Sequence, residues 1–260
     1  MTGCGAPYAT TTDMYATTTD MDPFRQKLCI WAGPVSLACF LIGMSFTGFA
    51  LPMSSELRPA EVVAFYQQHR VGIRIAAIFS LFCSGFMMMF AAAISAQLQR
   101  IEGRTTPWVF VQLMGGIMGN IPFALTGIIW TVAAFRPDRS PEVTQAINDL
   151  AWFVLEMPAP TAAIQFLAII CVVLGDHSND PVFPKWVAYL NILVALAFLP
   201  GVAGGLLVDY KTMDWNGAIA YSLPGAASAS WILLMFVALR NAARRAPSTL
   251  ATVPSQQPVA

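Results

Sequence analysis

Residues 108–135 read WVFVQLMGGIMGNIPFALTGIIWTVAAF, an apolar stretch that contains no charged side chain. The hydrocarbon core of a bilayer is about 30 Å thick, and an α-helix needs about 20 mainly apolar residues to cross it. This stretch is long enough to do so, and its few polar side chains are neutral. It therefore predicts a transmembrane helix.

Five further stretches are similarly apolar and long: residues 28–51, 71–98, 149–174, 186–208 and 215–239. Six such stretches in a chain of 260 residues leave too little polar sequence to cover them in water. The sequence therefore predicts an all-α fold, a polytopic transmembrane helical bundle of about six spans. Tryptophans lie near the ends of these spans, at positions 31, 108, 130, 152, 186 and 215. We expect them at the level of the lipid headgroups, where indole rings are enriched.

Two connecting segments predict short helices outside the spans. Pro59 is followed by apolar residues at a helical 3–4 spacing, which favours a short interfacial helix. Ser140, Pro141 and Glu142 combine a hydroxyl cap, a proline suited to the first helical position and an acid in the first turn. They predict a surface helix that begins at Pro141 and leads into the fourth span. Prolines inside the spans, at positions 122, 158, 160, 200 and 224, predict kinked helices.

The chain divides into three predicted parts. Residues 1–27 are polar and contain the heptad YATTTDM twice in succession, so we expect a disordered tail. Residues 28–239 form the six-helix transmembrane domain. Residues 240–260 begin with basic side chains and continue as a second disordered tail. Arg25 and Lys27 precede the first span, and because cytoplasmic flanks are enriched in basic residues, we expect both termini in the cytoplasm.

Composition excludes several classes of function. Only 11% of the residues are charged, against about 25% in a typical soluble domain, and the formal net charge is zero. Such a chain offers no basic surface for nucleic acid. The two histidines and five cysteines do not follow zinc-site spacing, and no glycine-rich phosphate loop occurs. We expect no metal, no cofactor and no nucleic-acid partner.

Besides Asp149, the first residue of the fourth span, two charged side chains lie within the predicted spans. Arg74 lies one turn into the second span, and Glu156 reaches a comparable depth in the fourth span from the same side. Charges at such positions face the interior of a bundle or a wet cavity. Three interpretations remain open: an Arg74–Glu156 ion pair that holds two helices together, contact with a ligand or proton, and contact with the membrane interface.

Neutral polar residues lie deeper in the spans: Gln112, Asn120, Thr126, Gln165 and Asn191. Such side chains usually form hydrogen bonds that hold neighbouring helices in register. Asn120 differs from the others because it lies between Gly119 and Pro122. Gly115 and Gly119 have the small-residue spacing that allows close approach of another helix.

Prolines 158, 160, 200 and 224 fall in the same half of the spans as Arg74 and Glu156. Broken helices are tolerated in lipid where protein or water satisfies the freed backbone groups. We therefore expect residues 156–160 and 199–205 to form walls of a mainly apolar cavity. The candidate ligand-binding residues are Arg74, Asn120, Trp130, Glu156 and Tyr221.

Three hypotheses for function follow. The first is binding or transport of a lipid or lipophilic small molecule. The second is an intramembrane acid–base enzyme of the isomerase or cyclase type. In that enzyme Glu156 would donate the proton, with Asp209 or Asp149 as the second carboxyl group. The third is a scaffold subunit, as a homo-oligomer or within a membrane complex.

Two segments carry a resemblance to a known group of proteins. Residues 58–66, RPAEVVAFY, leading to Arg74, and residues 130–142, WTVAAFRPDRSPE, look like uncharacterised multi-pass membrane proteins of high-GC bacteria. The resemblance extends over about residues 24–239. It implies the same six-span architecture in the bacterial inner membrane, and it implies no activity.

Overall fold

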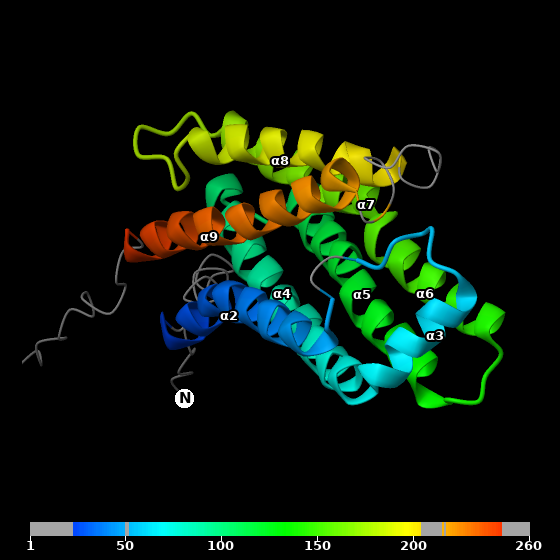
Figure 1. Cartoon of the computed structure of the whole chain (residues 1–260). Coiled ribbons are helices and arrows are strands. Elements are labelled where there is room, and N and C mark those ends of the chain that lie inside the picture. The colour runs from blue at the N-terminus through cyan, green and yellow to red at the C-terminus, as the bar shows by residue number, and fades with distance from the viewer. Residues whose placement is uncertain (1–22, 50–51, 204–214, 216, 246–260) are drawn as a thin grey trace, which may run out of the picture.

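The computed structural model describes residues 23–49, 52–203, 215 and 217–245 (Figure 1). All regular secondary structure in this part of the chain is helical, so the predicted all-α fold is confirmed there. The helices are α2 (Pro23–Thr47), α3 (Pro59–Gln68), α4 (Arg70–Glu102), α5 (Pro107–Phe135), α6 (Pro141–Glu156), α7 (Ala159–Gly175), α8 (Trp186–Ala203), the π-helical turn η1 (Ala218–Ser222) and α9 (Leu223–Arg244).

Five helical segments of the described chain are long and apolar enough to cross a membrane: Pro23–Thr47, Arg70–Glu102, Pro107–Phe135, Pro141–Gly175 and Ile219–Arg244. The fifth predicted span corresponds to α8, whose apolar described part, Trp186–Gly201, is shorter. These apolar helices indicate a multi-pass membrane protein. With 33 residues, α4 is about 50 Å long and exceeds the thickness of a hydrocarbon core.

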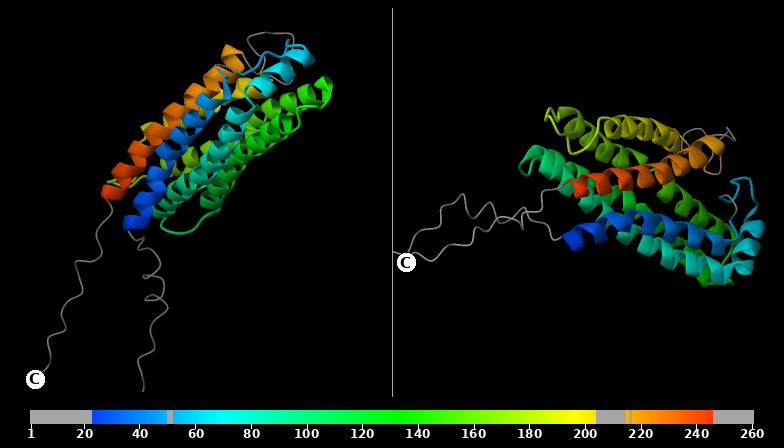
Figure 2. Two further views of the ribbon diagram at one scale, coloured as in Figure 1. Left: turned by 60° about the horizontal axis from the view of Figure 1, so that its bottom comes forward. Right: turned by 90° about the vertical axis from the view of Figure 1, so that its left-hand side faces the viewer.

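The long helices run alternately up and down the bundle (Figures 1 and 2). α2, α4 and α5 pack side by side, α7 packs between α5 and α8, and α9 crosses from α8 to α2. We call the end where α2 begins and α9 finishes the termini end. We call the opposite end, where α3 packs against α6, the α3 end.

Local sequence explains several helix boundaries. The Ser140 side chain accepts a hydrogen bond from the backbone N–H of Val143, so the predicted start of a helix at Pro141 is confirmed. The helix predicted after Pro59 is also present. α2 ends at Thr47, before the predicted end of the first span, because Gly48 has a φ of 73° and terminates the helix.

The prolines differ in their effects. Pro158 separates α6 from α7, as predicted, and Pro160 fits into the first turn of α7, where a missing N–H costs nothing. Pro224 lies in the first turn of α9, directly after the π-helical turn. Pro122 and Pro200 lie inside α5 and α8, neither of which ends there. Pro34, which was not among the predicted kink positions, lies inside α2.

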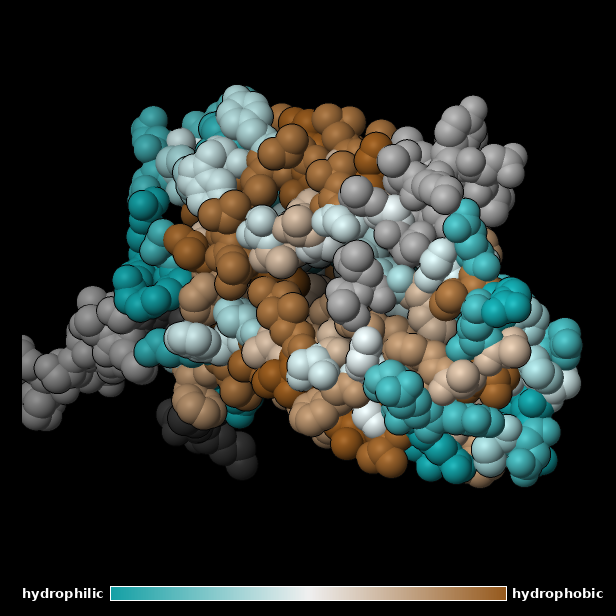
Figure 3. Space-filling model, viewed as in Figure 1, coloured by the Kyte–Doolittle hydropathy of each residue, from teal (hydrophilic) through white to brown (hydrophobic). Residues whose placement is uncertain are grey.

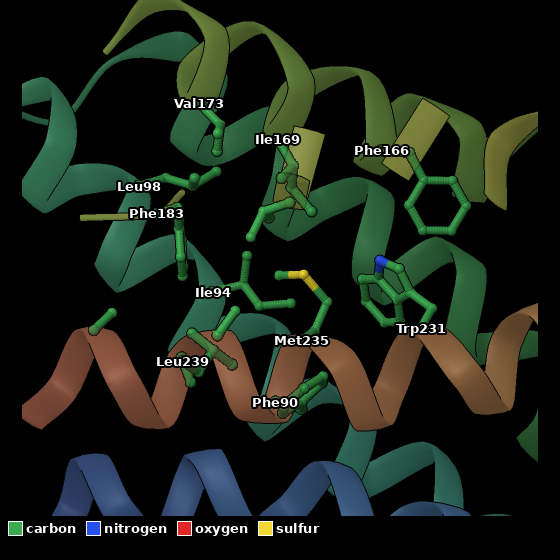
Figure 4. Close-up of a cluster of buried hydrophobic side chains, with 14 of the residues drawn as sticks. Phe90, Ile94, Leu98, Phe166, Ile169, Val173, Phe183, Trp231, Met235 and Leu239 are labelled. Atoms are coloured by element: carbon green, nitrogen blue, oxygen red, sulfur yellow. The ribbon is translucent and has the colours of Figure 1, made fainter. Parts of the chain in front are cut away.

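The buried apolar side chains form two clusters. The large cluster joins α2, α4, α5, α7, α8 and α9 toward the termini end, and Figure 4 shows its centre around Ile94 and Met235. The aromatic cluster lies toward the α3 end and contains Phe49, Tyr66, Trp130, Trp152 and Trp215. Outside the clusters, many large apolar side chains are exposed, and hydrophobic residues cover much of the visible face (Figure 3). A lipid environment would accommodate this exposed apolar surface.

The tryptophans differ in exposure. Trp108 and Trp186 are exposed at the starts of α5 and α8, and Trp31 is exposed eight residues into α2. Trp130, Trp152 and Trp215 are buried in the aromatic cluster, so their rings contact other side chains, and the headgroup location stays a prediction. Their rings pack against other aromatic rings, which keeps a large apolar area away from solvent.

Glycines allow α2, α4 and α5 to approach each other closely. A methyl group added to Gly43 of α2 would lie 2.8 Å from Phe79 Cβ on α4. One added to Gly127 of α5 would lie 3.0 Å from the carbonyl oxygen of Ala77 on α4. Side chains larger than hydrogen therefore do not fit at either contact without a shift of the backbone.

Candidate functional site

A cavity of about 190 Å³ lies between the two clusters. Its walls come from α2, α4, α5, α6, α7, α8, η1 and α9, and most of the lining side chains are Leu, Phe, Met, Pro, Ala or Gly. Phe166 and Trp231 belong both to this lining and to the large cluster. Leu155 and Tyr221 line the cavity and pack against the aromatic cluster.

Two helix interruptions and the proline-containing part of α8 meet at one part of the cavity wall. α6 ends at Glu156 and the chain turns at Pro158, and both residues line the cavity. Gly201, next to Pro200 of α8, lies beside the carbonyl oxygens of Glu156 and Ala220, which would be 3.6 and 3.7 Å from an added Cβ. Ala220 belongs to the π-helical turn, a geometry that is often found at functional sites. The interruptions thus bring backbone polar groups to the cavity.

Polar side chains also line the cavity, namely Asn120, Glu156, Gln165, Tyr221 and Ser228. The Ser228 hydroxyl donates to the carbonyl oxygen of Pro224 at 2.8 Å, and the Asn120 amide donates to the carbonyl oxygen of Gly116 on its own helix. Among the described lining residues there is no Lys, Arg or His, and Glu156 is the one carboxylic acid. The cavity is therefore an apolar space with a carboxyl group in its wall.

Comparison of the chain with family models, with curated proteins and with solved structures found no match.

The structure brings together some of the predicted site residues and separates others. Asn120, Glu156 and Tyr221 line the cavity, as do parts of both predicted wall segments. Asp209 lies outside the described residues. Trp130 does not line the cavity. It lies in the aromatic cluster, where the centroid of its ring is 5.3 Å from that of Trp152 and 5.7 Å from that of Phe49.

Arg74 also lies away from the cavity, and the proposed Arg74–Glu156 ion pair is not formed in this structure. The Arg74 guanidinium donates to the carbonyl oxygens of Ala134 and Phe135, both at 3.3 Å, and lies over the Phe135 ring. Arg70 donates to the same two carbonyl groups at 3.0 and 2.8 Å. The end of a helix exposes carbonyl oxygens that have no partner in the helix and attract cations. Both arginines therefore bind the free carbonyl oxygens at the C-terminal end of α5.

The deeper polar residues mostly connect helices, as predicted. The Trp231 indole N–H donates to Asn191 Oδ1 at 3.0 Å, which joins α9 to α8. The Thr126 hydroxyl donates to the carbonyl oxygen of Ala151 at 3.2 Å, which joins α5 to α6. The Ser95 hydroxyl donates to Gln112 Oε1 between α4 and α5. Three of the five predicted polar residues thus form interhelical hydrogen bonds with their side chains.

The predicted close approach at Gly115 and Gly119 is also confirmed. A methyl group on Gly115 would lie 2.9 Å from the backbone nitrogen of Gln165, and one on Gly119 would lie 3.3 Å from Ala162 Cβ. Both contacts place α7 against α5. Gln165 and Ala162 also line the cavity, so this contact sets the position of one cavity wall.

One buried polar group was not anticipated from the sequence. Asn148 Oδ1 accepts hydrogen bonds from the Tyr66 hydroxyl at 3.0 Å and from the Trp152 indole N–H at 3.2 Å. Burial raises the pKa of Tyr66, and the charge of the neighbouring Asp149 adds to the increase. The spacing of four residues between Asn148 and Trp152 was the available signal, because it places both side chains on one face of a helix.

Among the described residues, no group of three or more His, Cys, Asp and Glu side chains is arranged to hold a metal ion. Of the described lining residues, Glu156 and Tyr221 can exchange a proton as well as form hydrogen bonds, and they lie next to a large apolar surface.

Proposed function

We propose that the chain is an integral membrane protein that binds a lipophilic molecule in the cavity between its two clusters. The observation that carries this proposal is the position of Glu156 at a helix break, in the wall of an otherwise mainly apolar cavity. A carboxyl group in such a wall can form a hydrogen bond with a polar group of a ligand, while the surrounding side chains contact its apolar part.

The volume supports the binding of a small apolar group. A cavity of about 150 Å³ lined by aliphatic and aromatic side chains can bind benzene. The present cavity, at about 190 Å³, is somewhat larger. It could hold a compact ligand or the head of a longer one, with most of the contact made by apolar side chains.

Binding is favoured over the other two hypotheses because it needs only groups that line the cavity. The acid–base hypothesis needs a second carboxyl group beside Glu156. Of its two candidates, Asp149 does not line the cavity and Asp209 lies outside the described residues. A scaffold role would not require an apolar cavity with a carboxyl group. We also propose, from the resemblance noted above and from Arg25 and Lys27, that the protein lies in a bacterial inner membrane with cytoplasmic termini.

Mass spectrometry of the full chain, purified from membranes in a mild detergent, tests the proposal. We expect the wild-type protein to retain a lipophilic molecule at a fixed ratio, and the Glu156→Met variant to lose most of it. Glu142→Met is the matched control, because Glu142 is an exposed acid in the first turn of the same helix. Equal retention by wild type and Glu156→Met, or no retained molecule in the wild type, would contradict the proposal.

A further inference from the structure

Helices α2 and α9 are in contact toward the termini end and diverge from there (Figures 1 and 2). The contact includes Trp31 of α2 and Phe236 of α9, whose ring centroids are 4.8 Å apart. Beyond this contact the two helices contribute facing residues to the cavity. Leu37 and Phe40 come from α2, and Gly225 and Ala229 come from α9. The cavity therefore lies where α2 and α9 separate.

The side chains that α9 presents at this separation are small. Gly225, Ser228 and Ala229 line the cavity and are exposed or half-buried. A methyl group added to Gly225 would meet no atom of the described residues within 4 Å. Because Gly225 both lines the cavity and is exposed, we infer that the cavity opens at the surface beside this residue. We call the opening between Phe40 and Gly225 the α2–α9 mouth.

The position of the α2–α9 mouth along the helices indicates what surrounds it. Phe40 lies seven residues before the end of α2, which corresponds to about 10 Å. Gly225 lies six residues after the start of the last apolar segment at Ile219, about 9 Å along it. Leu41 and Leu223, next to the mouth, are large and exposed. In a membrane this opening would face the hydrocarbon of the lipid chains.

The charges around the cavity restrict the head group of a ligand. Glu156 is an acid and none of the described lining residues is basic, so this part of the lining disfavours a phosphate or carboxylate head. Glu156 and Tyr221 can both form hydrogen bonds with a neutral hydroxyl group. The cavity volume is sufficient for a small head group and the first carbons of a chain, and the remaining chain can pass through the mouth.

We propose that ligands reach the cavity sideways from the lipid layer through the α2–α9 mouth, and that they are single-chain lipid alcohols. The hydroxyl group binds at Glu156 and Tyr221, and the hydrocarbon tail extends between α2 and α9 into the bilayer. This proposal rests on the proposed function and adds the access route and the ligand class.

The test uses the full chain in phosphatidylcholine nanodiscs with a photoreactive 1-hexadecanol that carries a diazirine near its hydroxyl group. We expect saturable labelling of peptides that contain the cavity-lining parts of α2, α6 and α9. Unlabelled 1-hexadecanol should compete at least about tenfold better than hexadecyl phosphate, because the anionic head would lie near the Glu156 carboxyl group and meet no basic side chain among the described lining residues. Equal competition by the phosphate would overturn the assigned ligand class.

Closing the mouth tests the access route. Gly225→Leu should reduce saturable labelling at least about tenfold, since the added side chain fills the opening. Gly85→Leu is the matched control: Gly85 is an exposed glycine of α4 with equally open space around it, and it does not line the cavity. Ala229→Leu provides a second change at the mouth, and a thermal unfolding scan shows which variants are folded.

The outcomes separate the two proposals. If wild type retains a lipophile that Glu156→Met loses, but labelling by the alcohol is unchanged in folded Gly225→Leu and Ala229→Leu, sideways access is wrong and the binding function stands. If wild type neither retains a lipophile nor shows saturable labelling, both proposals are wrong.

Discussion

The large cluster and the aromatic cluster occupy opposite halves of the bundle and are built differently. The large cluster consists mostly of aliphatic side chains on regular helices, and Ile94, Leu98 and Met235 in it are completely buried. The aromatic cluster joins α3, α4, α5 and α6 and includes the buried hydrogen-bond acceptor Asn148 at its edge. The helix interruptions at Glu156–Pro158 and at η1 fall between the two.

This difference explains the position of the cavity. Aliphatic side chains on regular helices fill space efficiently and leave few voids. Large rings with fixed hydrogen bonds, such as Trp152 on Asn148, have fewer ways to fill an irregular space. Where the two kinds of packing meet, α6 ends and the chain turns at Pro158, and the space between them is not filled.

If the helices cross a membrane, a membrane-impermeant reagent on one side should reach residues at one end of the bundle and none at the other end. In a background without the five native cysteines, Asp180→Cys in the α7–α8 connection and Asp138→Cys in the α5–α6 connection should react with a membrane-impermeant maleimide from opposite sides. Both positions are exposed. Labelling in sealed inner-membrane vesicles and in intact cells distinguishes the sides. Reaction of both cysteines from one side would exclude the up-and-down arrangement between them.

In the large cluster, Phe90→Ala should have the greatest effect on stability. Phe90 is completely buried and packs on Gly33 and Trp231. Its truncation should lower the free energy of unfolding by about 3–5 kcal/mol through lost contacts and the resulting void. Phe82→Ala on the same helix is the control, since Phe82 is 58% exposed. Denaturant titration in detergent measures both variants, and equal losses would show that Phe90 is not a core residue.

In the aromatic cluster, Asn148→Ala should lower the free energy of unfolding mainly because it removes a hydrogen-bond acceptor. Asn148→Ala leaves the Tyr66 hydroxyl and the Trp152 N–H without their acceptor, at a cost of about 1–3 kcal/mol. The exposed Asn179→Ala in the α7–α8 connection is the matched control. A double-mutant cycle with Tyr66→Phe should show positive coupling between residues 66 and 148. Strict additivity would mean that the hydrogen bond does not contribute.

A smaller effect on the free energy of unfolding is expected at the C-terminal end of α7, where the Lys185 ammonium group binds backbone carbonyl oxygens. Lys185 Nζ donates to the carbonyl oxygens of Val173, Leu174 and Asp176 at 2.9, 3.0 and 2.7 Å. Lys185→Met should lower the free energy of unfolding by up to about 2 kcal/mol, because these carbonyl groups lose their donor and the helix dipole loses its cation. Lys27→Met, at an exposed position of α2, should have little effect in the same assay. A loss no larger than that of Lys27→Met would show that the contact is not stabilising.

The sequence was sufficient to predict features that depend on one helix at a time. Apolar length predicts a helix that can span a membrane, and Ser140 with Pro141 predicts where α6 begins. Gly115 and Gly119 predict a close contact because a helix face without side chains favours one. The partner in that contact, Gln165 with Ala162 on α7, required the structure.

Features that depend on which helices are neighbours could not be predicted in the same way. Arg74 and Glu156 have similar depths in their helices, but depth does not determine direction around the helix axis. Arg74 faces the end of α5, whereas Glu156 lines the cavity. Trp130 shows the same limit, since its position near the end of a span predicts a headgroup location and the tertiary packing buries it.

The glycine contacts between α2, α4 and α5 differ from the surroundings of Gly225. At Gly43 and Gly127 even a methyl group would meet the neighbouring helix, so α2, α4 and α5 are closely packed. On the opposite side, α9 follows a π-helical turn and meets the cavity through Gly225, where an added methyl group would meet no described atom within 4 Å. For the proposed binding function, this asymmetry predicts that a ligand is exchanged by displacement of the first turns of α9. It also predicts that the motion of this segment sets the lifetime of the bound state.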